Sequence, residues 1–304
     1  MRRIVITGAT GAIGTAVVNQ MIKENVEVLV LCRENSKRNA RIPKHDLVKM
    51  QYCSLDELKD LNNVSNEPYD VFYHFGWSGT TGAFRNNMTE QLQNVQYTLD
   101  AVEAAARLGC KKFVGAGSQA EYGRVEGVLH ASTPTFPENG YGIAKLCAGQ
   151  MSRILCEQKG MEHVWTRILS VYGPNDTDAS MIMSTIGKLL NKEVPKLTKG
   201  EQEWDYLYSE DAAKAMYLIG LHGKHGKTYC IGGGKTKPLL EYVKILRDAI
   251  DKDAQLGVGE IPYSDKQVMY LCADITELQE DTGFTPDVRF EEGIANTINW
   301  YKGR

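Results

Sequence analysis

The first fourteen residues contain the pattern that most constrains how this chain can fold. Residues 4–7 are apolar or β-branched, and three glycines in the spacing G-x-x-G-x-x-G follow at once: Gly8, Gly11 and Gly14. Glycine permits a sharp turn and a close approach of the backbone to a ligand, and a helix that begins in such a turn offers unpaired N–H groups to an anion. Because the glycines lie between a predicted strand and a predicted helix, the segment predicts a turn that binds the diphosphate of a dinucleotide.

Short β-branched segments alternate with longer segments of helical periodicity through the first half of the chain. The predicted strands are residues 3–7, 26–32, 48–53, 71–75, 112–117 and 164–169, and the predicted helices are residues 13–24, 87–108 and 140–158. The helices have the length of crossover connections between parallel strands. This alternation predicts an α/β fold with a doubly wound, Rossmann-like parallel sheet.

After Tyr172-Gly173-Pro174 the pattern changes to helices, loops and short strands. This change predicts a smaller C-terminal substrate lobe built on the sheet rather than a second independent domain. We expect residues 1–170 to form the dinucleotide-binding domain, with about residues 205–231 returning to it. Residues 171–204 and 232–304 are then expected to form the lobe.

Composition excludes several classes of partner. The chain has 304 residues and a formal net charge of −3, without the basic stripe that a nucleic-acid backbone requires. Its apolar runs are too short for a membrane span, and its seven cysteines are scattered without a C-x-x-C pair. His222 and His225 lie in a Gly/Lys loop without a nearby carboxylate or cysteine. We therefore expect a cytoplasmic protein with reduced thiols and no metal, nucleic-acid or membrane partner.

The end of the second predicted strand bears on the choice of cofactor. An acidic residue at this position commonly binds the ribose 2′-hydroxyl of NAD, whereas an arginine accommodates the 2′-phosphate of NADP. The strand ends in Arg33, and Ser36, Lys37 and Arg38 follow. Since a guanidinium pairs well with a phosphate, this segment favours NADP, with NAD as the alternative.

A tyrosine and a lysine share one face of the third predicted helix. Tyr141 and Lys145 are four residues apart, and a nearby ammonium stabilises a phenolate, which can then accept and return a proton. Upstream, Ser118 follows a strand at the edge of the sheet where such folds bind ligands. These residue types suit the interconversion of a ketone and an alcohol.

The glycine spacing, the segment from Ser118 to Tyr122-Gly123 and the Tyr141/Lys145 pair together resemble the extended short-chain dehydrogenase/reductase family, in its NAD(P)-dependent nucleotide-sugar epimerase/dehydratase group. The resemblance extends over almost the whole chain, through Asn94, residues 172–174, residues 229–234 and Asp274. It implies that Tyr141 is the general acid/base, that Lys145 holds the nicotinamide ribose and tunes Tyr141, and that Ser118 hydrogen-bonds the reacting oxygen. It also implies hydride transfer by the nicotinamide, a nucleotide-sugar substrate and a homodimer.

The motifs and the resemblance together give a set of expected contacts. The residues expected to bind the cofactor are Gly8, Thr10, Gly11, Ala12, Ile13, Gly14, Arg33, Ser36, Arg38, Phe75, Gly76 and Lys145. Those expected to contact the substrate are Trp77, Gln119, Glu121, Asn175 and Trp204.

Two departures from the family pattern narrow the reaction. Sugar 4,6-dehydratases of this family carry an Asp-Glu pair directly after the catalytic Thr, where this chain has Gln119 and Ala120. An amide and a methyl group cannot act as acid and base, so 4,6-dehydration is disfavoured. Glu121 lies one position beyond the Asp-Glu pair, and a structural role is the alternative to its contact with the substrate.

The second departure is Trp204, which stands where the family usually has a diphosphate-binding arginine; Lys196, Lys199 or Arg289 are candidates to replace that arginine. Two reactions remain open, epimerisation of a nucleotide sugar and NADPH-dependent reduction of a 4-keto sugar. A non-catalytic, NADP(H)-sensing regulatory protein of the same fold is the alternative from another class.

Overall fold

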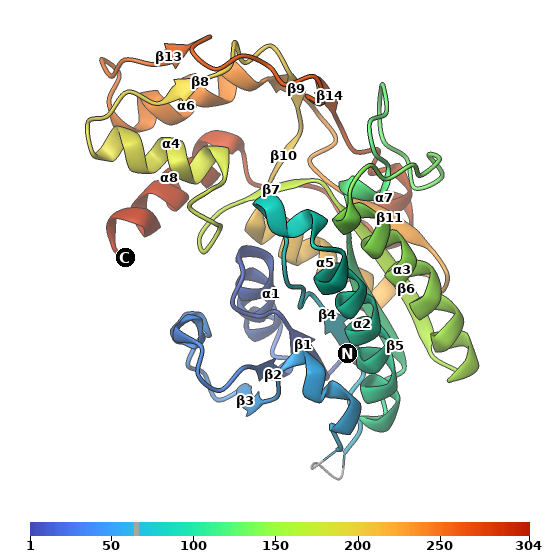
Figure 1. Cartoon of the computed structure of the whole chain (residues 1–304). Helices are drawn as coiled ribbons and strands as arrows, with labels where there is room; N and C mark the ends of the chain where they lie inside the picture. The colour runs from blue at the N-terminus through green and yellow to red at the C-terminus, as the bar shows by residue number, and fades with distance from the viewer. Residues whose placement is uncertain (64–66) are drawn as a thin grey trace.

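The main sheet of the protein is parallel throughout (Figure 1). A computed structural model describes residues 1–63 and 67–304, and within them seven strands pair in the order β11-β6-β5-β4-β1-β2-β3. The strands are β1 (Arg3–Thr7), β2 (Glu27–Cys32), β3 (Val48–Tyr52), β4 (Val71–His74), β5 (Lys112–Ser118), β6 (Glu162–Ile168) and β11 (Thr228–Ile231). The order reverses between β1 and β4, so the predicted doubly wound, Rossmann-like fold is confirmed.

Helices cover both faces of this sheet. The helices α1 (Ala12–Lys23) and α5 (Ser209–His222) pack together on one face, and α2 (Met88–Arg107) and α3 (Gly140–Gln158) pack together on the other. Alternate residues of β1 therefore enter different cores: Ile4 and Ile6 pack with Val17 of α1, whereas Val5 packs with Ala101 of α2. Burial on both faces explains why these strands read as continuous apolar runs.

The predicted elements differ from the observed ones by at most two residues at an end. The largest shift is at the start of β6, because Glu162 and His163 already pair with Lys112 and Phe113 of β5. The strand β11 was not predicted as a strand. Short 3₁₀ helices fill the remaining connections: η1 (Lys37–Arg41), η2 (Leu55–Asp60), η3 (Gly82–Asn86) and η4 (Gln119–Glu121).

Short strands and helices after β6 build the lobe above the carboxyl ends of the main strands (Figure 1). Its small sheets pair β7 (Ser170–Tyr172) with β10 (Tyr206–Tyr208), β9 (Glu203–Trp204) with β12 (Lys237–Pro238) and β14 (Tyr270–Leu271), and β8 (Lys196–Leu197) with β13 (Gly257–Val258). A third core lies among α4 (Met181–Leu190), α6 (Leu239–Ile250) and α8 (Phe290–Lys302), while α7 (Thr276–Thr282) contacts β11 and α5.

Asp205 lies between β9 and β10. Its buried carboxylate accepts hydrogen bonds from the backbone N–H groups of Gly233, Gly234 and Ala273, at 2.6, 3.1 and 3.0 Å. These bonds tie three segments of the chain together. The exact division into domain and lobe that we expected from the sequence stays a prediction.

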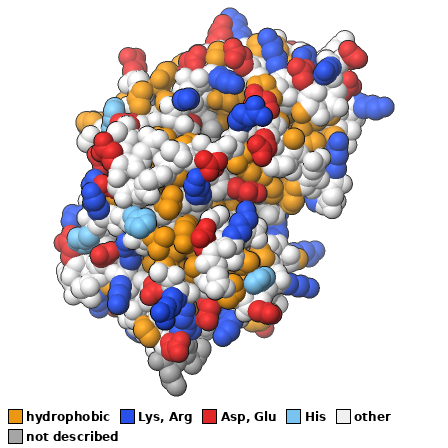
Figure 2. Space-filling model, turned by 180° about the vertical axis from the view of Figure 1, so that it is seen from behind, with side chains coloured by type: hydrophobic (Ala, Val, Ile, Leu, Met, Phe, Trp, Pro, Cys, Tyr) orange, Lys and Arg blue, Asp and Glu red, His pale blue; other side chains and the backbone are white. Residues whose placement is uncertain are grey.

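The surface and the thiols agree with the composition. Figure 2 shows Lys and Arg interspersed with Asp and Glu over the face it presents, rather than gathered into a stripe. All seven cysteines are free, and six of them are buried. In the part of the chain that the structure describes, no helix has both the length and the apolar character to cross a bilayer.

Candidate active site

The glycine turn after β1 has a geometry that only glycine allows. Gly8 has a φ of +73°, and a Cβ there would lie 2.6 Å from the carbonyl carbon of Phe75. A Cβ at Gly14 would lie 2.2 Å from the Gly8 oxygen, whereas the space beside Gly11 is open, with the nearest atom 3.8 Å away. The first intrahelical bond of α1 runs from Thr15 to Gly11, so the N–H groups of residues 12–14 remain for a ligand. The turn therefore fits a diphosphate.

The end of β4 lies beside this turn. The Gly76 N–H donates to Oγ1 of Thr7 at 3.1 Å, and the same oxygen lies 2.9 Å from Nδ1 of the buried His74. A Cβ at Gly76 would lie 2.7 Å from Cδ2 of Leu55. The predicted cofactor residues Phe75 and Gly76 are therefore placed at the point where the strand order reverses, the edge at which such sheets bind ligands.

The three predicted catalytic residues come from β5 and α3. Ser118 ends β5, and the side chain of Asn139 starts α3 by accepting a hydrogen bond from the Gly142 N–H at 2.9 Å. One turn further, the buried Lys145 donates from Nζ to the Ala116 oxygen at 2.6 Å, with Nζ 5.8 Å from the ring centroid of Tyr141. Side-chain hydrogen bonding with Ser118 favours the phenolate of Tyr141. The fold thus brings these residues together.

The surroundings shift the pKa values of both α3 residues. Burial raises the pKa of Tyr141, while Ser118 and the positive charge of Arg85 lower it. Burial lowers the pKa of Lys145 to about 7, against the opposing effect of Glu121. Lys145 is therefore able to change its charge near neutral pH, which is typical of lysines in active sites.

Glu121 has a different place from the one expected. Its side chain is fully buried and accepts hydrogen bonds from the Ser118 N–H (2.8 Å), Nε1 of Trp165 (3.0 Å) and Nε of Arg167 (2.9 Å). A carboxylate held by three donors inside the protein cannot meet a substrate directly. The expected substrate contact of Glu121 is therefore corrected to the structural alternative, in which Glu121 orients Ser118.

Two other expected substrate residues lie next to the predicted catalytic triad of Ser118, Tyr141 and Lys145. The ring of Trp77 meets that of Tyr141 edge-on, with centroids 6.1 Å apart, and its centroid is 3.7 Å from Nζ of Lys145. Gln119 follows Ser118 directly in η4 and is half-buried. Both residues are therefore close to the predicted reacting centre.

A basic segment folds back over the glycine turn. Arg33 and Ser36 precede η1, which contains Arg38, and the amide of Asn39 donates to the Arg33 oxygen at 2.8 Å. At the end of η1, Arg41 donates to the oxygens of Thr10 and Asn175, at 3.2 and 3.4 Å. Asn175, with a φ of +66°, thereby lies near the cofactor turn.

Arg41 is a candidate site residue that sequence reasoning missed. Burial, followed by the nearby charges of Arg38 and Arg304, lowers its pKa, with Asp178 opposing. The signal in the sequence was the basic run 37–41, but only the fold of η1 shows that its last arginine reaches the glycine turn. A cluster of cations beside this turn attracts a further anion.

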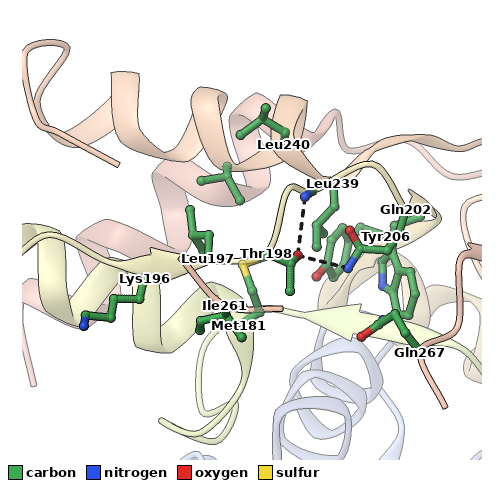
Figure 3. Close-up of a pocket in the computed structure, with 13 residues that line it drawn as sticks. Met181, Lys196, Leu197, Thr198, Gln202, Tyr206, Leu239, Leu240, Ile261 and Gln267 are labelled. Carbon is green, nitrogen blue, oxygen red and sulfur yellow. Dashed lines mark hydrogen bonds between the residues drawn. The ribbon is translucent and has the colours of Figure 1, made fainter. Parts of the chain in front are cut away.

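The lobe contains an apolar cavity of about 290 Å³ (Figure 3). Apolar side chains from α4, β8, α6 and the β12-β9-β14 region form most of its wall, with amide groups at one end. The lining residues are Met181, Lys196, Leu197, Thr198, Gly200, Gln202, Trp204, Tyr206, Leu239, Leu240, Val243, Ile261 and Gln267. Among the candidates to replace the family arginine, which are Lys196, Lys199 and Arg289, the described lining of the cavity includes Lys196 alone.

Trp204 is fixed in the wall of this cavity. Its Nε1 donates to Oγ of Ser170 at 2.8 Å, which joins β9 to the start of β7. An indole held in this way offers an apolar face and no positive charge.

Comparison with known proteins identifies the family. Residues 4–232, which include the glycine turn and the triad, match the model of the NAD dependent epimerase/dehydratase family. The chain belongs to this family. A dTDP-glucose 4,6-dehydratase from Streptomyces niveus is 26% identical over 325 residues, covering 99% of this chain and 93% of that protein. The family's members are enzymes of the extended short-chain dehydrogenase type, so this chain is an enzyme and the family predicted from the sequence is confirmed.

Solved structures of family members share the fold. The UDP-N-acetylglucosamine 4-epimerase from Methanobrevibacter ruminantium M1, in complex with UDP-N-acetylmuramic acid, superposes with a TM-score of 0.88 at 22% identity, covering 99% of this chain and 98% of that one. The UDP-glucuronic acid 4-epimerase from Bacillus cereus, in complex with NAD, gives a TM-score of 0.85 at 19% identity and covers 99% of both chains. The first of these two proteins thus binds a nucleotide sugar, and the second binds NAD, on the architecture that this chain shares.

Proposed function

We propose that the protein transfers a hydride between NADP(H) and a ring carbon of a nucleotide-linked sugar, with reduction of a 4-keto sugar as its net reaction. The observation that carries this proposal is the convergence of Ser118, Tyr141 and Lys145 on the same sheet edge as the open glycine turn. A proton donor and a dinucleotide site side by side are what carbonyl reduction requires.

Each residue of the triad has a defined task in this reaction. The bound nicotinamide supplies the hydride. Tyr141 donates its phenolic proton to the carbonyl oxygen as that oxygen becomes an alkoxide, and Ser118 hydrogen-bonds the same oxygen. Lys145, held by the Ala116 oxygen, stabilises the resulting phenolate and offers its remaining N–H groups to the nicotinamide ribose. The residues of the glycine turn would hold the diphosphate of the cofactor, and Phe75 and Gly76 lie beside that turn.

The basic segment supports NADP as the cofactor. Arg33 ends the second strand, and Arg38 and Arg41 lie in η1, with Arg41 in hydrogen-bond contact with the glycine turn. The additional phosphate of NADP would relieve the repulsion among these cations. Since NADPH is the usual source of hydride for net reduction, this cluster also supports the direction of the reaction.

The apolar cavity of the lobe suits the base of the nucleotide. A nucleobase is flat and uncharged, and its edge carries hydrogen-bond donors and acceptors. The wall of Trp204, Leu197 and Leu239 matches the flat surface, and Gln202 and Gln267 can pair with the edge (Figure 3). Lys196, the cation of the lining, lies at the end opposite the two glutamines and forms an ion pair with Glu260 at 3.8 Å (Figure 3).

Dehydration remains disfavoured in this proposal, although 4,6-dehydratases are prominent among the relatives. Gln119 and Ala120 lack acid–base groups, and Glu121 is fully buried with its carboxylate accepting three internal hydrogen bonds. Epimerisation is the second candidate, because the same triad serves it and epimerases are among the structures that share the fold.

The first experiment offers the purified protein a nucleoside-diphosphate 4-keto-6-deoxy sugar with NADPH or NADH and follows loss of reduced-cofactor absorbance. We expect stoichiometric consumption of NADPH, with much slower use of NADH. A parallel reaction offers a UDP-linked hexose with catalytic cofactor and reads the stereochemistry at C-4 by NMR. Inversion at C-4 without net cofactor consumption would contradict the reductase and support the epimerase. Release of water with formation of a 4-keto product would instead show that the protein is a dehydratase.

We also propose that two copies of the chain associate through α2 and α3. One face of α3 carries Ile143, Met151 and Ile154, which are 44–53% exposed, and Met88 and Leu92 of the adjacent α2 are 60% and 71% exposed. Such a stripe on two packed helices suits a four-helix interface. M151E should convert a dimer to a monomer in light scattering, whereas M50E, at an exposed methionine of β3, should not. A wild-type monomer would contradict the proposal.

A further inference from the structure

A second cation lies against the ring of Tyr141. The guanidinium carbon of Arg85, in η3, is 4.6 Å from the Tyr141 ring centroid. Arg85 is half-buried, and no hydrogen-bond or ion-pair acceptor for its guanidinium occurs among residues 1–63 and 67–304. Its charge therefore faces the ring without a carboxylate to neutralise it.

Contacts from two helices fix the segment that carries Arg85. Oδ1 of Asn86 accepts from the Gly140 N–H at 3.0 Å, directly before Tyr141. From α2, Nε2 of the buried Gln91 donates to the oxygens of Phe84 and Gly79, at 3.0 and 2.8 Å. Oε1 of Gln91 accepts from Nε1 of Trp77 at 2.9 Å. The position of Arg85 is thus built into the fold.

The ammonium of Lys145 has other partners at the same time. It donates to the Ala116 oxygen at 2.6 Å and lies over Trp77, 3.7 Å from the ring centroid. Its distance from the Tyr141 centroid is 5.8 Å, longer than the 4.6 Å of Arg85. The positive charge closest to the phenol ring is therefore that of Arg85.

We propose that Arg85 is a positioning residue for the acid–base step: its guanidinium packs on the ring of Tyr141 and stabilises the phenolate in addition to Lys145. This proposal rests on the proposed acid–base function of Tyr141. In this arrangement the ammonium of Lys145 holds the ribose and the Ala116 backbone oxygen, while Arg85 supplies a positive charge to the face of the phenol ring.

The other groups that face Tyr141 agree with this role. Ser118 from β5 and Arg85 from η3 lower the pKa of Tyr141, while burial, the largest effect, and Glu121 from η4 raise it. Arg167 balances the charge of Glu121 at 2.9 Å. Removing Arg85 leaves burial less opposed, so the pKa of Tyr141 rises; proton donation then persists to higher pH, and proton acceptance also requires higher pH.

The test follows the ionisation of Tyr141 directly, without substrate. The protein is labelled with carbon-13 at the tyrosine Cζ, the Tyr141 resonance is assigned from its loss in Y141F, and its shift is titrated in the NADP-bound protein. R85Q should raise the pKa of Tyr141 by about half a unit, and R85K should raise it less because it keeps the charge but loses the planar packing. R153Q, which removes a half-buried arginine that pairs with Glu157 on α3, away from Tyr141, should leave the titration unchanged.

An unchanged Tyr141 titration in folded R85Q and R85K would overturn the role of Arg85. If R85Q does not fold, R85K and the salt dependence of the wild-type titration test the proposal instead. Because salt screens the charge of a half-buried cation, added salt should raise the pKa of Tyr141. Because the titration contains no substrate, it tests the role of Arg85 even if the proposed reductase activity is not found. The pH profile of turnover, where measured, should move in the same direction as the titration.

Discussion

The edge of the main sheet and the cavity of the lobe differ in how strongly their residues are constrained. At the sheet edge, added atoms at Gly8 or Gly14 would overlap the backbone, and Glu121 is locked by three donors. In the lobe, Trp204 occupies the place of the family's usual arginine, and the wall around it is mostly apolar. The proposed site of hydride and proton transfer is therefore fixed by backbone geometry, whereas the proposed substrate site is formed by side chains that can change while the fold stays the same.

The largest expected effect comes from the sheet edge. Y141F removes the proton donor and should lower kcat by about 10²–10⁴-fold, with little change in the dissociation constant of NADPH measured by calorimetry. Y52F, at an exposed tyrosine at the end of β3, serves as the matched control. Full activity in Y141F would show that the chemistry lies elsewhere.

E121Q tests whether the sheet edge is as rigid as its buried contacts indicate. The change leaves the charge of Arg167 buried without its partner and should lower the free energy of unfolding by about 3 kcal/mol in urea denaturation. E138Q breaks the exposed pair with Arg124 and should cost less than about 1 kcal/mol. Equal losses in both variants would remove the distinction between the buried network and the surface.

R41A separates the two cofactors. Loss of a guanidinium near the phosphate should weaken NADPH binding by about tenfold and leave NADH binding almost unchanged. R153A removes a half-buried arginine of α3 and provides the comparison. A parallel loss of both affinities would mean that Arg41 supports the glycine turn through Thr10 rather than reading the additional phosphate.

The smallest effect is expected in the lobe. W204A should raise KM for the nucleotide sugar by about 2–10-fold, because an aromatic stacking contact is lost. The kcat and the affinity for NADPH should stay close to wild type. W204F keeps an aromatic face and should retain most of the affinity. If W204A lowered kcat without changing KM, the cavity would belong to the catalytic step and the contrast between the two regions would fail.

The sequence predicted the fold and the central site because both depend on local patterns. Strand–turn–helix spacing placed the cofactor turn, and the interval between Tyr141 and Lys145 placed both on one helix face. Contacts that depend on distant segments escaped it. Glu121 was expected at the substrate, with a structural role as the alternative, and its partners Trp165 and Arg167 come from β6.

The sequence by itself determined the family and the parallel sheet, and it predicted the cofactor turn and the triad, because periodicity and glycine stereochemistry act within a few residues. Tertiary structure alone decided that Arg41 reaches the glycine turn, that Arg85 packs on Tyr141, and that Trp204 lines a cavity with α6. These contacts join residues far apart along the chain. Their geometry arises from the packing of helices and loops on the sheet, which no local spacing encodes.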